Sequence, residues 1–182
     1  MQSNPRTRRL SADEMLELWR LVRHFEPLAG EGATIARADG PDLDRALRED
    51  LRRWYARCYA ELPARHLPQE DFAPFAEMRR TPDGIGIVSL PERCAVPLDI
   101  LVEGWERPAV ITTPDTPLAA DQSSPFIRGG MVNPVAVVSP SGEMRLYTVP
   151  DGADIDRLTG VALPEEGYYL VTDRMLPEIF ED

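Results

Sequence analysis

The sequence predicts an α+β fold, in which amphipathic helices form a small helical layer and a β-rich part is inserted before a closing helical segment. Up to residue 62, apolar side chains recur every three or four positions, as they do along one face of a helix. From residue 63 onward prolines recur at short intervals, and they break helices and limit strands to short pieces. With 182 residues, of which 43% are hydrophobic, the chain is long enough to bury a core.

This change of pattern divides the chain into three regions. Residues 1–10 are expected to be a flexible arm, and residues 11–62 together with 165–182 are expected to form the helical layer. Residues 63–164 are expected to form an antiparallel β-sheet insertion, with a long Pro-rich loop at 113–134.

The arm carries three arginines and no periodicity, so we expect it to be loose unless a partner holds it. Behind it, Ser11 and Glu14 have the spacing of a capping box, in which the hydroxyl and the carboxylate each accept a backbone N–H. Apolar residues then recur at helical spacing from Met15 to Phe25, before Pro27. The sequence therefore predicts a first helix that begins at Ser11.

A second, longer helix is predicted from about Pro41 to Leu62, because apolar side chains again recur at three- and four-residue spacing. Its other faces carry arginines, among them Arg45, Arg48 and Arg52. These guanidinium groups form either a patch for an acidic partner or an ordinary solvated face.

The β-rich insertion holds five candidate strands: 85–90, 96–102, 109–112, 135–139 and 144–149. The last two flank a Ser-Pro-Ser-Gly turn at 139–142, which predicts a hairpin with Met144 and Leu146 on one face. Residues 168–180 are expected to be helical or mixed, since their apolar residues could line one face.

The loop at 113–134 contains four prolines and two adjacent glycines, and loops of this length inside a domain usually serve a function or are disordered. It nevertheless carries several apolar side chains. Two interpretations stay open: an ordered arm that buries these side chains against another polypeptide, which we favour, or a loop folded back on its own domain. The candidate interaction residues are Arg45, Arg48, Arg52, Leu118, Phe126, Ile127, Arg128 and Met131.

The charge of the chain argues against nucleic acid as a main partner. The net charge is −11; residues 1–70 hold 12 arginines and 12 acidic residues, whereas residues 71–182 hold 8 arginines and 19 acidic residues. A surface of this kind repels phosphate backbones. All basic side chains are arginine, and no apolar stretch approaches the roughly 18 residues of a membrane span. We expect neither membrane nor sequence-specific nucleic-acid binding.

The sequence contains no motif for catalysis, for a small-molecule substrate or for a cofactor. It lacks G-x-S-x-G, and the two cysteines and two histidines do not occur in a metal-binding spacing. Gly84 and Gly86 lack the third glycine of a nucleotide loop. The acidic run at 151–156 is predicted to be a solvated turn, although binding of a cation there stays open.

The order of elements resembles that of bacteriophage head-to-tail connector (adaptor) proteins. The resemblance covers roughly residues 40–180 and rests on segments 88–93 (VSLPER), 101–105 (LVEGW), 120–129 (ADQSSPFIRG), 133–138 (NPVAVV) and 145–147 (RLY). It implies a non-enzymatic virion protein, assembled in the host cytoplasm, whose copies form a homo-oligomeric ring next to a portal.

The sequence is compatible with three hypotheses about function. The first is the ring-forming connector subunit. The second is a small acidic, cytoplasmic module that binds a protein partner through the Pro-rich loop. The third is an enzyme with a carboxylate site near Asp151, Asp154 and Asp156.

Overall fold

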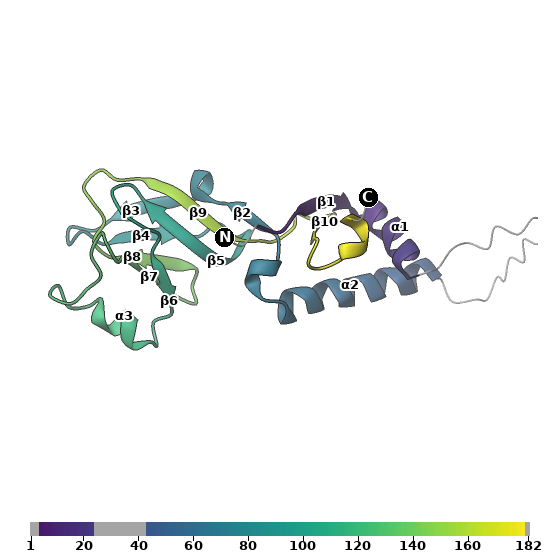
Figure 1. The fold of residues 1–182 in the computed structure, drawn as a ribbon, viewed down its shortest axis with the longest axis horizontal. Coiled ribbons are helices and arrows are strands. Elements are labelled where there is room, and N and C mark those ends of the chain that lie inside the picture. The colour runs from purple at the N-terminus through teal and green to yellow at the C-terminus, as the bar shows by residue number, and fades with distance from the viewer. Residues whose placement is uncertain (1–3, 24–42, 181–182) are drawn as a thin grey trace, which may run out of the picture. The chain divides into compact units, whose positions relative to one another are not determined.

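The protein is described by a computed structural model, which covers residues 4–23 and 43–180 (Figure 1). The chain divides into two compact units and has the predicted α+β composition. Unit 1 consists of Met1–Pro68 and Pro164–Asp182, and unit 2 of Gln69–Leu163. Among the described residues, no helix combines the length and the apolar character that a bilayer-spanning segment needs.

Unit 1 packs two helices against a two-stranded antiparallel sheet. The helices are α1 (Ala12–Val22) and α2 (Leu43–Glu61), and the strands are β1 (Thr7–Ser11) and β10 (Tyr168–Thr172). The short 3-10 turns η1 (Ala64–His66) and η3 (Pro177–Phe180) complete the unit. The predicted capping box at the start of α1 is confirmed, since Ser11 accepts from the Glu14 N–H and Glu14 accepts from the Ser11 N–H. Residues around Phe25 and Pro41, where the predicted helices end and begin, lie outside the described residues.

The helical faces predicted from periodicity supply the core of unit 1. Met15, Leu16 and Trp19 of α1 are buried, as are Leu47 and Leu51 of α2. The buried side chains follow the three- and four-residue spacing of the sequence, because only one face of each helix is turned inward.

The prediction that residues 1–10 form a flexible arm is wrong for residues 7–10, which belong to β1 and pair with β10. The C-terminal part of the same unit holds the arm in place. Arg8 Nη1 donates to the Ile179 carbonyl at 2.7 Å, and Arg9 Nη2 lies 2.6 Å from Glu165 Oε2. The arginines that marked this segment as polar and loose therefore tie the two ends of the chain together.

The closing segment, expected to be helical or mixed, is mixed: residues 168–172 form strand β10 where a helical layer was predicted, and the 3-10 turn η3 follows. Strand β1 pairs with one edge of β10. At Leu170 the other edge meets the Tyr55 hydroxyl, which accepts from the Leu170 N–H at 3.1 Å and donates to its carbonyl at 3.0 Å. The backbone groups of Leu170 thus find partners outside a helix, which satisfies the requirement that buried polar groups be paired.

Unit 2 contains two sheets, and Figure 1 shows their strands. The three-stranded sheet has the order β2-β9-β5, and the five-stranded sheet has the order β3-β4-β8-β7-β6. The strands are β2 (Gln69–Asp71), β3 (Glu77–Arg80), β4 (Gly86–Ser89), β5 (Cys94–Val102), β6 (Val110–Thr112), β7 (Val135–Val138), β8 (Glu143–Leu146) and β9 (Ile155–Ala162). Two short helical segments, η2 (Ala73–Phe75) and α3 (Pro117–Asp121), lie between strands.

The predicted hairpin at 139–142 is confirmed. Strands β7 and β8 pair antiparallel with Val138 opposite Met144, and Ser139 N–H donates to the Glu143 carbonyl at 2.8 Å. Met144 and Leu146 are completely buried, as their shared face predicted. Gly142 has a φ of 79°, a left-handed conformation that glycine adopts without steric strain.

Two features of unit 2 differ from the prediction. The five-stranded sheet is mixed and not wholly antiparallel, because β6 runs parallel to β7. The parallel pairing requires a crossover, and residues 113–134 supply it. The acidic run predicted as a turn leads at Ile155 into β9, which is the central strand of the other sheet.

Strand β9 also places Gly160 against Cys94. A Cβ atom at Gly160 would lie 2.5 Å from Cys94 Sγ, so the close approach of the two strands requires glycine. Burial in this contact raises the pKa of the Cys94 thiol to about 11. The cysteine is therefore a packing residue and not a reactive thiol.

Candidate interaction surface

The crossover at 113–134 is built from local turn and cap interactions. The Thr116 hydroxyl accepts from the Ala119 N–H at 3.2 Å and caps α3, with Pro117 in its first turn. Just before it, the Thr113 hydroxyl donates to the Asp115 carboxylate and lowers the pKa of that group. One of the four prolines that indicated an irregular loop, Pro117, thus begins a short helix, since proline fits the first turn of a helix.

Gln122, which is 1% exposed, fixes the middle of the crossover. Its side-chain Nε2 donates to the Leu118 carbonyl at 3.0 Å, and its Oε1 accepts from the Gly129 N–H at 2.8 Å. A single buried amide side chain therefore joins the start of the loop to its end, and satisfies two backbone groups.

The second attachment comes from Thr148, which follows β8. The Thr148 hydroxyl donates to the Gly129 carbonyl at 2.7 Å, and the Thr148 carbonyl accepts from Trp105 Nε1 at 3.2 Å. Thr148 has a φ of 63°, which costs a β-branched residue about 1–2 kcal/mol. The two hydrogen bonds offset this strain, and the one to Gly129 attaches the loop to the segment that follows β8.

Gly129 is required at this attachment. A Cβ atom there would collide with the backbone oxygen of Asn133 and would lie 3.1 Å from Val135 Cγ2, whereas a Cβ at Gly130 would meet nothing within 4 Å. The two adjacent glycines of the sequence therefore have different roles, and only the first is dictated by packing.

The fixed crossover presents apolar side chains to solvent. Phe126 is 93% exposed and Ile127 is 62% exposed, and three other residues of the crossover, Leu118, Met131 and Val132, are also exposed. The backbone between them is ordered, since Ile127 and Arg128 N–H groups both donate to the Ser124 carbonyl. We call Leu118, Phe126, Ile127, Met131 and Val132 the exposed loop residues.

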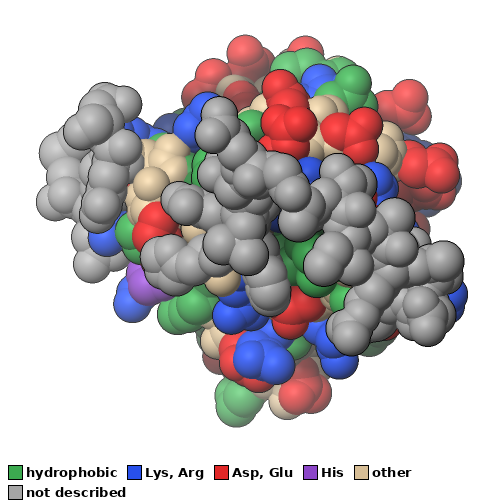
Figure 2. Space-filling model, turned by 90° about the vertical axis from the view of Figure 1, so that its right-hand side faces the viewer, with side chains coloured by type: hydrophobic (Ala, Val, Ile, Leu, Met, Phe, Trp, Pro, Cys, Tyr) green, Lys and Arg blue, Asp and Glu red, His purple; other side chains and the backbone are tan. Residues whose placement is uncertain are grey.

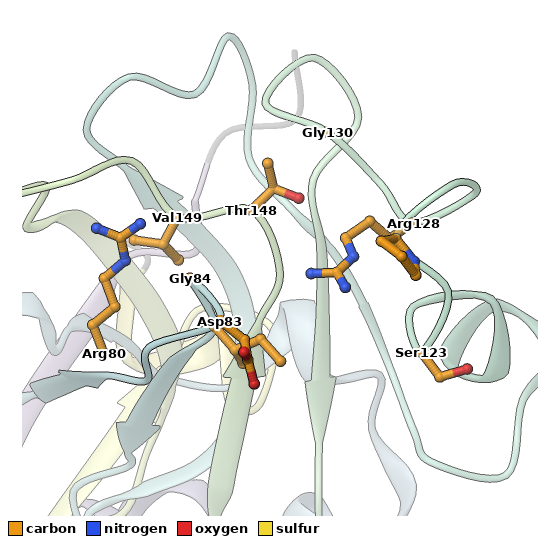
Figure 3. Close-up of a pocket in the computed structure, with 10 residues that line it drawn as sticks. Arg80, Asp83, Gly84, Ser123, Arg128, Gly130, Thr148 and Val149 are labelled. Atoms are coloured by element: carbon orange, nitrogen blue, oxygen red, sulfur yellow. The ribbon is translucent and has the colours of Figure 1, made fainter.

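A cavity of about 740 Å³ lies beside this loop in unit 2 (Figure 3). Its charged lining residues are Arg80, Asp83 and Arg128, and Thr148 lies among the others. In Figure 3 the Arg128 side chain extends from its loop toward Thr148, and Arg80 stands on the opposite side. Arg80 is paired with Asp151, but Arg128 has no ion-pair or side-chain hydrogen-bond partner among the described residues, and its Nε atom is buried.

The arginines predicted on the second helix lie on α2 of unit 1, and the loop belongs to unit 2. Within their own unit, Arg45 pairs with Glu49 at 3.6 Å and Arg48 with Asp13 at 3.5 Å, while Arg52 is exposed. Figure 2 shows acidic and basic side chains interspersed on the face it presents. Arg45 and Arg48 are thus paired with carboxylates of their own chain, as expected on an ordinary solvated face.

Sequence reasoning selected the exposed residues of the loop but missed the residues that hold it. Gln122 and Thr148 stand in no sequence pattern. Gln122 bonds backbone groups of Leu118 and Gly129, across turns of the same loop, and Thr148 bonds Gly129, which lies 19 residues before it. The glycine pair was the only available indication, since adjacent glycines often mark a close backbone approach.

The acidic run at 151–156 does not form a cluster in the structure. Asp151 pairs with Arg80, and Asp156 lies in strand β9. Within residues 4–23 and 43–180, no three His, Cys, Asp or Glu side chains come together as metal ligands would. His66 contributes its backbone carbonyl as an acceptor for Thr172, while His24 lies outside the described residues.

No protein-family model, curated protein or solved structure matches this chain. The candidate surface is therefore defined by its own geometry: an ordered loop with exposed apolar side chains, beside a cavity lined by Arg128, which has no ion pair within residues 4–23 and 43–180.

Proposed function

We propose that this chain is a non-enzymatic structural subunit that assembles into a homo-oligomeric ring, as bacteriophage head-to-tail connector proteins do next to a portal. The observation that carries the proposal is the exposure of Phe126 and Ile127 on a loop whose backbone is fixed by Gln122 and Thr148. Large apolar side chains held rigidly in water are typical of a contact surface for another protein.

The energetics favour association through this loop. Burying a side chain the size of Phe or Ile contributes about 1.5–3 kcal/mol. Because Phe126 and Ile127 are attached to an ordered backbone, little further entropy is lost when a partner covers them. The exposed loop residues can therefore supply the centre of an interface, with the polar residues around them as its rim.

The charge distribution is compatible with a connector. Unit 2 holds 14 acidic residues and 7 arginines, so it carries a net charge of −7. A surface of this charge repels DNA, which suits a ring through which DNA has to pass without binding. The resemblance in segments 88–93, 101–105, 120–129, 133–138 and 145–147 supports the same assignment, and the ring and its place in a virion remain part of the proposal.

The test is the oligomeric state of the full-length chain, measured by sedimentation velocity over a range of concentrations, with electron microscopy of the assembled fraction. We expect the wild type to form closed rings and a Phe126→Ser/Ile127→Ser variant to stay monomeric with an unchanged circular dichroism spectrum. Phe75→Ser is the matched control, since Phe75 is 69% exposed in unit 2 but lies in η2.

The outcomes separate the candidate functions. A wild-type chain that is monomeric at every concentration would contradict the ring. If such a monomer captures a different protein and loses it when Phe126 and Ile127 are replaced, the chain is instead a binding module that uses the same loop. A Phe75→Ser variant that loses assembly as well would show that the loop has no special role.

A further inference from the structure

We infer that Arg128 binds a carboxylate group of a second copy of this chain when the exposed loop residues are covered, an inference that rests on the proposed self-assembly. Three observations support it: Arg128 has no ion pair in the part of the chain that the structure describes, it lines a cavity beside the loop, and the chain has a large surplus of carboxylates.

The first observation concerns the guanidinium group itself. Its Nε atom is buried and has no acceptor, and no ion pair or side-chain hydrogen bond joins it to another described residue. A buried donor without an acceptor is destabilising, and charged donors form the strongest hydrogen bonds when an acceptor is supplied. Because Nε is closed to solvent, a ligand with acceptor oxygens has to bind through the Nη atoms, and it would give the guanidinium group the ion pair that it lacks among the described residues.

The second observation is the position of Arg128. It follows Ile127 directly and is two residues from Phe126, the most exposed large apolar side chain of the described residues. The residues on either side of Phe126 and Ile127, Pro125 and Arg128, line the cavity, so a partner that covers Phe126 and Ile127 comes close to it. Figure 3 shows the Arg128 side chain extending from this loop toward Thr148. The opposite arginine, Arg80, is already paired with Asp151 and is therefore less able to bind an incoming carboxylate.

The third observation identifies the group that Arg128 would bind. A guanidinium fork matches the two oxygens of a carboxylate. The chain has 31 acidic residues and 20 arginines, so many of its carboxylates have no basic partner in the same molecule. A polyanion such as nucleic acid would have to approach a unit with a net charge of −7, whereas a neighbouring copy needs to insert only one side chain.

Asp83 lines the same cavity, is exposed, and makes no ion pair with Arg128. An incoming carboxylate is repelled by this like charge. Replacing Asp83 by Asn should therefore strengthen association, in contrast to the replacement of Arg128. Opposite effects of two substitutions in one cavity are not expected from general damage to the fold.

The experiment measures the association constant of the full-length chain by sedimentation equilibrium at one fixed ionic strength. We expect Arg128→Gln to weaken association about tenfold or more, as the loss of a charge-assisted hydrogen bond does. Asp83→Asn should strengthen it roughly two- to fivefold, the range of exposed charge pairs. Arg107→Gln is the control, because it makes the same change in net charge at an exposed position of unit 2 outside the cavity.

Arg128→Lys provides a second variant, which keeps the positive charge but loses the fork. Its association constant should lie between those of the wild type and Arg128→Gln. If Arg128→Gln is folded by circular dichroism and associates like the wild type, while replacement of Phe126 and Ile127 abolishes assembly, the inference is wrong and the proposed function stands. A wild type that never associates would overturn both. A thermal stabilisation by inorganic phosphate that Arg128→Gln abolishes would make the cavity a phosphate site, and would also overturn the inference.

Discussion

Replacing Tyr55 by Phe tests how strand β10 is held in unit 1, because it removes one oxygen atom and leaves the ring. The Tyr55 hydroxyl accepts from the Leu170 N–H at 3.1 Å and donates to the Leu170 carbonyl at 3.0 Å. The ring also contacts the ring of Tyr169, with centroids 4.9 Å apart, and that contact is kept in the variant. Leu170 is 6% exposed, so water cannot readily replace the hydroxyl.

The loss of the two hydrogen bonds to Leu170, at about 1 kcal/mol each, lowers the free energy of unfolding by about 2 kcal/mol. The loss of the 3.3 Å hydrogen bond between the Tyr55 and Tyr59 hydroxyls, and the unpaired backbone groups, would add to this. Urea unfolding followed by tryptophan fluorescence measures the change. Trp19 and Trp54 both lie in unit 1, so a Trp105→Phe background restricts the fluorescence to that unit. With an m-value near 1–2 kcal/mol/M, the urea midpoint should fall by about 1–2 M.

The effect should also depend on pH. Burial raises the pKa of Tyr55 above its ordinary value of 10.0. Because the folded state holds the proton more tightly, the stabilisation is fully present below pH 10 and is lost as the pH rises through the folded-state pKa. The difference between wild type and Tyr55→Phe should therefore narrow above pH 10. A Tyr55→Phe variant as stable as the control Tyr168→Phe, which removes a hydroxyl from an exposed residue, would refute the role assigned to Tyr55.

Three further substitutions or measurements test the rest of the fold. Gly129→Ala should release the crossover and make it sensitive to limited proteolysis, whereas Gly130→Ala should leave cleavage unchanged; equal behaviour of the two would contradict the packing described at Gly129. Since the pKa of Cys94 is about 11, its thiolate fraction at pH 8 is roughly two hundredfold below that of a free thiol, and peptide-level labelling with a disulfide reagent should follow unfolding; rapid labelling of the native protein would show that the thiol is accessible. Ser11→Ala removes the cap of α1 and should lower the free energy of unfolding by about 1 kcal/mol. The Ser11 backbone N–H holds the pKa of Glu14 below its ordinary value, so the stabilisation by this hydrogen bond should fade as the pH falls through the folded-state pKa of Glu14. A urea midpoint that changes neither in Ser11→Ala nor at low pH would exclude the capping box.

The accuracy of the sequence-based predictions depended on the range of the interactions. The capping box of Ser11, the amphipathic faces of α1 and α2 and the hairpin at 139–142 were predicted correctly. Each of these is decided by residues close together in the sequence. The predictions for residues 7–10 and 168–172 were wrong, because these two strands satisfy each other's backbone across about 160 intervening residues.

The candidate surface shows the same division. Phe126 and Ile127 were selected from the sequence because apolar residues in a Pro-rich loop need burial somewhere. The sequence did not reveal that Gln122 and Thr148 would fix the loop backbone, since single hydrogen bonds between a side chain and a backbone group leave no periodic pattern.

The sequence by itself determined the α+β composition, the acidic charge and the segments with helical or turn character, because composition and short-range periodicity encode these properties directly. Only the tertiary structure decided which strands pair, that the 113–134 segment is an ordered crossover, and that Arg128 Nε has no acceptor among the described residues. The physical reason is that hydrogen-bond partners are brought together by folding. Whether a donor has an acceptor depends on the positions of residues that are far from it in the sequence.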